Sequence, residues 1–178
     1  MVLVIYDKQR IYEKSRSLLC RRFPHIITGG KGSCFYATAT ALVYLREAGL
    51  PVVLQAGSMS WPIIRREQDD GKRDTHFSYM WEIEDTIPDP VRPFLVTGHI
   101  PEVHCWLGIP ETHELIDFSM PEMRKHARNE LGEDAAGMVV PDYLWSNKLP
   151  DWVFYEPFRK ATELAYVIVE KILEEMIS

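Results

Sequence analysis

The chain has 178 residues, of which 46% are hydrophobic and 26% are charged, and its formal net charge is -6. This length and composition predict one folded domain over residues 1–178 and exclude a disordered chain. The negative charge argues against a nucleic-acid partner, because phosphate recognition requires clustered Lys and Arg. No apolar run approaches the roughly 20 residues that cross a bilayer, so we expect no membrane partner.

The chain contains three cysteines, an odd number that fits no closed disulfide framework. Free thiols are typical of a reducing compartment, so a cytoplasmic location is expected. No Cys-x-x-Cys pair occurs, and the histidines form neither His-x-His nor His-Glu-x-x-His. Three histidines are candidate ligands, His76, His99 and His113, but no motif organises them. We therefore expect no metal ion and no cofactor.

Helical spacing covers residues 6–22, and Pro24 ends this first helix. A glycine-rich loop then leads into a second helix that begins near Cys34. Its end is marked by a basic last turn at Arg46, by Gly49 and by Pro51. Small residues recur along one side of this helix, which predicts a buried and closely packed element.

Short apolar segments in the middle of the chain predict strands at Val52–Gly57, Thr75–Ile83, Val103–Leu107 and His113–Phe118. Four prolines make residues 86–101 an expected loop, and Met120–Leu131 is expected to be an exposed helix. The final segment, Phe158–Ile177, is an amphipathic helix that could pack on the sheet or form a homodimer face. Because the strands group between helices, we predict an α+β fold with an antiparallel sheet.

Cys34 lies in the first turn of its predicted helix, where thiolate formation is favoured. An unperturbed thiol has a pKa of about 8.5, and a helix N-terminus changes a pKa by only about one unit. A nearby imidazolium must therefore supply the remaining activation, and His104 is the candidate. Asp117 is the candidate for the third role, in which a carboxylate orients the imidazole and stabilises its charged form.

The spacing of His104 and Asp117 can be tested against hairpin geometry. Side chains alternate along a strand, so His104 shares a face with Trp106. A four-residue loop over Ile109–Thr112 would place Asp117 opposite His104. A five-residue loop would place Ile116 there and turn Asp117 to the other face. A shared site therefore predicts an even loop.

These segments resemble the transglutaminase-like branch of the papain-type cysteine protease fold. Gly32–Cys34 opens the nucleophile helix, and Leu45–Pro51 matches the way that this helix commonly ends. His104–Trp106 matches a histidine-x-tryptophan strand, and Leu115–Asp117 matches a strand that ends in aspartate. The resemblance covers about residues 30–120.

The resemblance implies a papain-type core, with a nucleophile helix on an antiparallel sheet and flanking terminal helices. It implies acyl transfer or amide hydrolysis through a thioester on Cys34, with His104 as base and Asp117 as orienting acid. The substrate would be a peptide, an amide or a small acyl compound. The Cys34 backbone N–H is one expected oxyanion donor, and further oxyanion or cleft candidates are Gln55, Tyr36 and Trp106.

Each residue also has a structural interpretation. Cys34 could be a small buried packing residue, His104 a core histidine, and Asp117 a cap for the turn at Ser119. In that case the chain would be a non-catalytic binding module on the same fold. A further alternative is a thiol hydrolase that acts on small metabolites instead of proteins.

Overall fold

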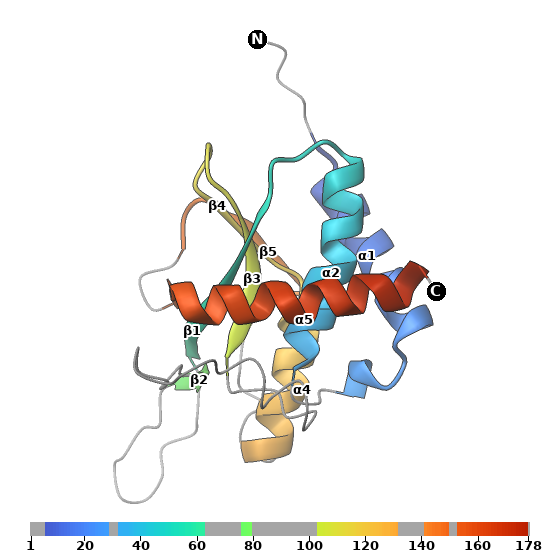
Figure 1. Ribbon diagram of the computed structural model, residues 1–178. Coiled ribbons are helices and arrows are strands. Elements are labelled where there is room, and N and C mark those ends of the chain that lie inside the picture. The colour runs from blue at the N-terminus through green and yellow to red at the C-terminus, as the bar shows by residue number, and fades with distance from the viewer. Residues whose placement is uncertain are drawn as a thin grey trace, which may run out of the picture.

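The computed structural model describes residues 6–28, 32–62, 76–79, 103–131, 141–149 and 153–177. These ranges form helices and an antiparallel sheet, which confirms the α+β class (Figure 1). The helices are α1 (Lys8–Arg22), α2 (Ser33–Glu47), α4 (Met120–Leu131) and α5 (Arg159–Ile177), with a 3-10 turn η1 (Ile26–Thr28). The strands are β1 (Val53–Pro62), β2 (His76–Tyr79), β3 (His104–Ile109), β4 (Glu114–Asp117), β5 (Leu144–Ser146) and β6 (Phe154–Pro157).

The described elements follow the predicted order, and several predicted residues fall outside them. The loop expected over residues 86–101 is outside the described ranges, as is His99. Between the helices predicted over Met120–Leu131 and Phe158–Ile177, where no element is predicted, the structure has two strands, β5 and β6. No described helix combines the length and the apolar character that crossing a membrane requires.

The predicted ends of α1 and α2 are confirmed, because both depend on local signals. The Asp7 side chain caps α1 by accepting a hydrogen bond from the Arg10 backbone N–H at 3.0 Å. At the end of α2, Gly49 has a φ of 75°, a left-handed conformation that glycine adopts without strain. The Leu50 N–H then returns to the Leu45 carbonyl at 3.0 Å and closes the helix.

Helices α1, α2 and α5 share one hydrophobic core with the sheet, and α5 crosses in front of α2 in Figure 1. Small residues allow close approach between these layers. Ala56 in β1 accepts a hydrogen bond from the Phe158 N–H at 2.9 Å, where α5 begins. The apolar face of α5 packs here rather than standing free, and the core residues include Ala37, Ala41, Leu45, Leu54, Cys105, Leu107, Ala161 and Ala165.

Helix α4 forms where it was predicted, but the expectation that it would be exposed was wrong. Its buried residues Met120, Met123 and Ala127 join a second cluster with Met59 and Trp61 from β1. The burial of this face could not be predicted from the mixed polar and apolar residues of α4, because the residues that cover it come from a distant strand.

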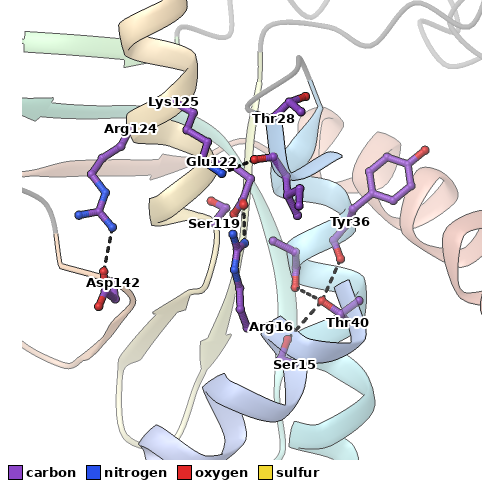
Figure 2. A network of polar contacts seen from close by, with 12 residues as sticks. Ser15, Arg16, Thr28, Tyr36, Thr40, Ser119, Glu122, Arg124, Lys125 and Asp142 are labelled. Carbon is purple, nitrogen blue, oxygen red and sulfur yellow. Dashed lines mark hydrogen bonds and ion pairs between the residues drawn. The ribbon is translucent and has the colours of Figure 1, made fainter. Parts of the chain in front are cut away.

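Polar contacts attach α4 to α1 and to the 3-10 turn η1 (Figure 2). The Arg16 guanidinium of α1 pairs with the fully buried carboxylate of Glu122. Burial raises the pKa of Glu122, and the neighbouring Arg16 opposes that rise. Lys125 donates to the carbonyl of Ile27 beside this pair. These contacts fix the start of α4, and therefore the turn that leads into it from β4.

Strand β1 has neighbours on both sides. Met59 pairs with Tyr79 of β2 and with Tyr155 of β6, and Gly57 pairs with His104 of β3 and with Pro157 of β6. Because β6 occupies one side of β1 in both cases, Tyr79 and His104 lie on the other side. Strands β2 and β3 therefore lie one after the other along the same edge of β1, and the side chains of Tyr79 and His104 belong to one row.

The β3–β4 hairpin has the predicted loop length in a different place. Leu107 pairs with Ile116 and Ile109 pairs with Glu114, so the loop is Pro110–His113 and the prediction of Ile109–Thr112 was wrong. Ile109 is buried and stays in the strand, while His113 closes the turn with a φ of 55°. The loop is still even, so Asp117 keeps the face of His104. Continuing this register places Asp117 opposite Trp106, diagonal to His104.

We expect Gly57→Ala to destabilise the protein by at least about 2 kcal/mol, because a well-packed site tolerates added atoms poorly. A Cβ at Gly57 would lie 2.0 Å from the backbone oxygen of Glu156 and would separate β6 from β1. Gly108→Ala is the matched control, since its Cβ would meet only the flexible Gln55 side chain, at 3.0 Å. Urea denaturation measures both changes, and equal midpoints for the two variants would contradict this account.

Candidate active site

The three predicted residues meet where α2 begins, β3 begins and β4 ends. The Cys34 thiol donates to the carbonyl of Val103 at 3.7 Å, directly before His104 in the chain. One helical turn later, the Thr38 hydroxyl donates to the carbonyl of Cys105 at 3.1 Å. The first turns of α2 therefore lie alongside β3. His104 Nε2 lies 2.6 Å from Asp117 Oδ2. The structure therefore brings a sulfur, an imidazole and a carboxylate together from three separate elements.

His104 is 1% exposed and is held in its charged form. Burial lowers its pKa, but the charge of Asp117 and its hydrogen bond raise it, and Cys34 adds a further increase. The result is a pKa of about 10, so the imidazole is protonated at neutral pH. Asp117 occupies Nε2, which leaves Nδ1 for the sulfur. Nδ1 is buried and has no hydrogen-bond partner, and Cys34 is near enough to the imidazole to raise its pKa.

The Asp117 carboxylate is 1% exposed and accepts four hydrogen bonds. Oδ2 accepts from His104 Nε2 at 2.6 Å and from the Tyr155 hydroxyl at 2.8 Å. Oδ1 accepts from the Ser119 backbone N–H at 2.9 Å and from its hydroxyl at 2.6 Å. Burial raises the pKa of Asp117, but His104 and Ser119 outweigh burial and lower it. Asp117 thus combines the two predicted roles: it orients the imidazole and it fixes the turn at Ser119.

Aromatic rings flank the imidazole. Tyr79 stacks on His104 with centroids 5.4 Å apart and planes at 17°, and Trp106 stacks with centroids 6.0 Å apart and planes at 19°. In the row along β1, His104 lies between these two residues. Aromatic faces attract a cation, so this arrangement favours the charged imidazolium. The Tyr79 hydroxyl is 2.5 Å from His126 Nδ1, which links the row to α4.

Three further candidates had been named for the cleft or the oxyanion site. Trp106 lies beside His104, as expected for a residue that lines the site. Gln55 accepts from Trp106 Nε1 at 2.8 Å, and on its other side it borders a cavity of about 340 Å³. Tyr36 packs against Phe23 with ring centroids 4.9 Å apart. Because Tyr36 is two positions after Cys34 in a helix, its side chain lies on a different side of α2 from the sulfur. The contacts given above for Gln55 and Tyr36 do not reach Cys34, and neither residue is assigned as an oxyanion donor.

The start of α2 presents backbone donors beside the sulfur. Gly32 precedes the helix with a φ of 80° and provides no side-chain cap. The first N–H groups of a helix have no partner within it, so the Cys34 N–H is available by its position. All three cysteines are free, including Cys34, which is 6% exposed. Within the described ranges, no group of three or more His, Cys, Asp or Glu gathers as metal ligands would.

Sequence reasoning missed Tyr155 and the Tyr79–His126 pair. Tyr155 lies in the stretch that could not be assigned, because β6 has only four residues and no clear alternation. Tyr79 lies within the strand predicted over Thr75–Ile83, but its partners His104 and His126 are distant in sequence. Only the register along β1 brings these residues together.

The His104–Asp117 pair makes stability depend on pH in a defined window. The pKa of His104 is raised from 6.5 to about 10, so its contribution is complete below pH 6.5 and is lost as the pH approaches 10. The pKa of Asp117 is lowered from 3.8, so its contribution is present above pH 3.8 and is lost as the pH falls through the folded-state value. The pair therefore stabilises the fold most between pH 3.8 and 6.5.

We expect Asp117→Asn to reduce the free energy of unfolding by about 3–5 kcal/mol in that window, the usual cost of breaking a buried ion pair. The deficit should shrink toward pH 10. Denaturation at several pH values measures it, with Asp142→Asn as the control, because the Arg124–Asp142 pair is solvent-exposed and worth about 1 kcal/mol or less. A deficit that does not vary with pH would contradict the ionic description.

Comparisons of the chain with protein-family models, with curated proteins and with solved structures found no match in any of the three. No relative therefore contributes an activity or a fold name.

Proposed function

We propose that this protein is a cysteine-dependent acyl transferase or amide hydrolase that works through a thioester on Cys34. The observation that carries the proposal is the buried His104–Asp117 pair, joined at 2.6 Å, beside a cysteine at the start of a helix. The order cysteine, histidine, aspartate also agrees with the resemblance to the transglutaminase-like branch. Under this proposal α2 and the antiparallel sheet are the papain-type core.

Acylation would begin from Cys34 as thiolate and His104 as imidazolium. The sulfur attacks the acyl carbon and forms a C–S bond, while the carbonyl π electrons move to the oxygen. As that oxygen re-forms the double bond, the C–N bond breaks and the amine leaves with its electron pair. The amine takes the Nδ1 proton of His104, so the products are a neutral amine, a neutral imidazole and a thioester.

Deacylation would reverse these roles. Neutral His104 removes a proton from an attacking water or amine, which adds to the thioester carbon. The C–S bond then breaks, and Cys34 leaves as thiolate beside the restored imidazolium. Water gives a carboxylic acid and an amine acceptor gives a new amide. Asp117 exchanges no proton in either step, since its role is to hold the imidazole and stabilise its charge.

The negative oxygen of the tetrahedral intermediate needs hydrogen-bond donors. The Cys34 backbone N–H is suited to this role, because it lies at a helix N-terminus without a side-chain cap. The positive end of the helix dipole acts in the same direction. One donor of this kind typically contributes about 10²–10³ in rate.

Burial supports the competing function, a non-catalytic binding module. Cys34 is 6% exposed and His104 is 1% exposed, whereas a nucleophile must meet its substrate. In a binding module the polar group would only join α2 to the sheet. The two functions differ in whether His104 increases the reactivity of Cys34.

We expect His104→Ala to slow alkylation of Cys34 by iodoacetamide at least about tenfold at pH 7, because it removes the positive charge that would stabilise the attacking sulfur. Peptide mass spectrometry follows Cys34 separately from Cys20 and Cys105. Asp117→Asn should have an effect of the same sign, because it leaves the buried imidazole without its carboxylate. His113→Ala, in an exposed turn, is the control. Equal Cys34 rates in all variants across pH 5–10 would favour the binding module.

A further inference from the structure

We infer that Tyr155 is a positioning residue of this site, whose hydroxyl fixes the Asp117 carboxylate so that Oδ2 faces His104. The catalytic meaning of this inference rests on the proposed function, but its geometry does not. Tyr155 comes from β6, 38 positions after Asp117 in the sequence. Its strand pairs with β1 at Met59 and Gly57, on the side of β1 opposite to His104.

Two donors from different strands hold Oδ2. His104 Nε2 is 2.6 Å away and the Tyr155 hydroxyl is 2.8 Å away. Oδ1 is held separately by Ser119, in the turn that follows β4. With Tyr155 present, the plane of the carboxylate is fixed at both oxygens. Without it, Oδ2 would be held only by the imidazole that it is meant to orient.

Trp61 determines the direction of the Tyr155 proton. Its indole Nε1–H donates to the Tyr155 oxygen at 3.0 Å, and an indole nitrogen is a donor only. The tyrosine hydroxyl therefore uses its oxygen to accept from Trp61 and its single proton to donate to Asp117. The chain Trp61, Tyr155, Asp117 has one possible order of donors and acceptors.

Tyr155 remains a donor over the working pH range. Burial and the negative charge of Asp117 raise the pKa of its phenol well above the usual value. Its ring is held by edge contacts with His104, at 5.9 Å between centroids, and with Trp106, at 5.1 Å. Because those contacts use the ring alone, Tyr155→Phe removes the hydroxyl and keeps the packing.

The test measures Tyr155→Phe in two ways. The first is the resonance of the proton on His104 Nε2 in ¹H–¹⁵N NMR spectra, which reports the hydrogen bond to Asp117 without any substrate. We expect this resonance to move upfield and to lose protection from solvent exchange. The second is the alkylation rate of Cys34, which should fall about tenfold, as loss of a hydrogen bond to a charged group predicts.

Tyr143→Phe is the matched control, because Tyr143 stacks on Tyr12 and contacts Phe118 edge-on, in a hydrophobic cluster separate from the one that Tyr155 joins. Tyr143→Phe should change neither the His104 Nε2 proton resonance nor the alkylation rate of Cys34. Trp61→Phe should give a smaller change in the same direction as Tyr155→Phe, and it keeps the test available if Tyr155→Phe does not fold. In an Asp117→Asn background, Tyr155→Phe should have no further effect on the rate, because the two residues act as one unit.

An unchanged Nε2 resonance in Tyr155→Phe would overturn the inference, as would an equal loss of rate with and without Asp117. Failure of the proposed function has a different signature. In that case the resonance responds to Tyr155→Phe, while the reactivity of Cys34 is insensitive to His104→Ala. That result would leave Tyr155 as the residue that positions Asp117 in a site without catalysis.

Discussion

The hydrogen-bonded ion pair between His104 and Asp117 is the interaction on which the rest of the site depends. Removing two charges from water costs several kcal/mol per ion, and further hydrogen bonds to the buried pair offset part of that cost. Asp117 accepts three hydrogen bonds in addition to the one from His104. The imidazole is protonated as a consequence, and its charge is directed at Cys34. A neutral or displaced imidazole would leave the sulfur with the helix dipole alone.

The fold serves this pair through three constraints. Gly57 lies opposite His104 and allows β6 to approach β1, which brings Tyr155 within reach of Asp117. The even loop of the β3–β4 hairpin keeps the carboxylate on the imidazole face. The Arg16–Glu122 pair anchors α4 and thereby the turn that Ser119 closes (Figure 2). Each constraint positions part of the same small polar group, which is assembled from distant segments.

Much of this arrangement could be predicted where the signal is local. The boundaries of α2 follow from Gly49 and Pro51, and the shared face of His104 and Asp117 follows from an even loop. The exact register did not, because the burial of Ile109 and the left-handed conformation of His113 depend on tertiary packing. The role of Tyr155 could not be predicted at all. It arises from a four-residue strand whose pairing is determined by β1 rather than by its own sequence.

The most direct test of the central claim is to look for the covalent intermediate. The protein would be mixed briefly with small thioesters, small amides and peptides, quenched in acid and digested for mass mapping. The account predicts an acyl group on the peptide that contains Cys34, formed and discharged in the wild type and absent in Cys34→Ala. A small-metabolite enzyme would be acylated by the small compounds and not by the peptides. Acylation confined to Cys20, or no acylation of Cys34 by any acyl donor, would contradict the enzymatic account.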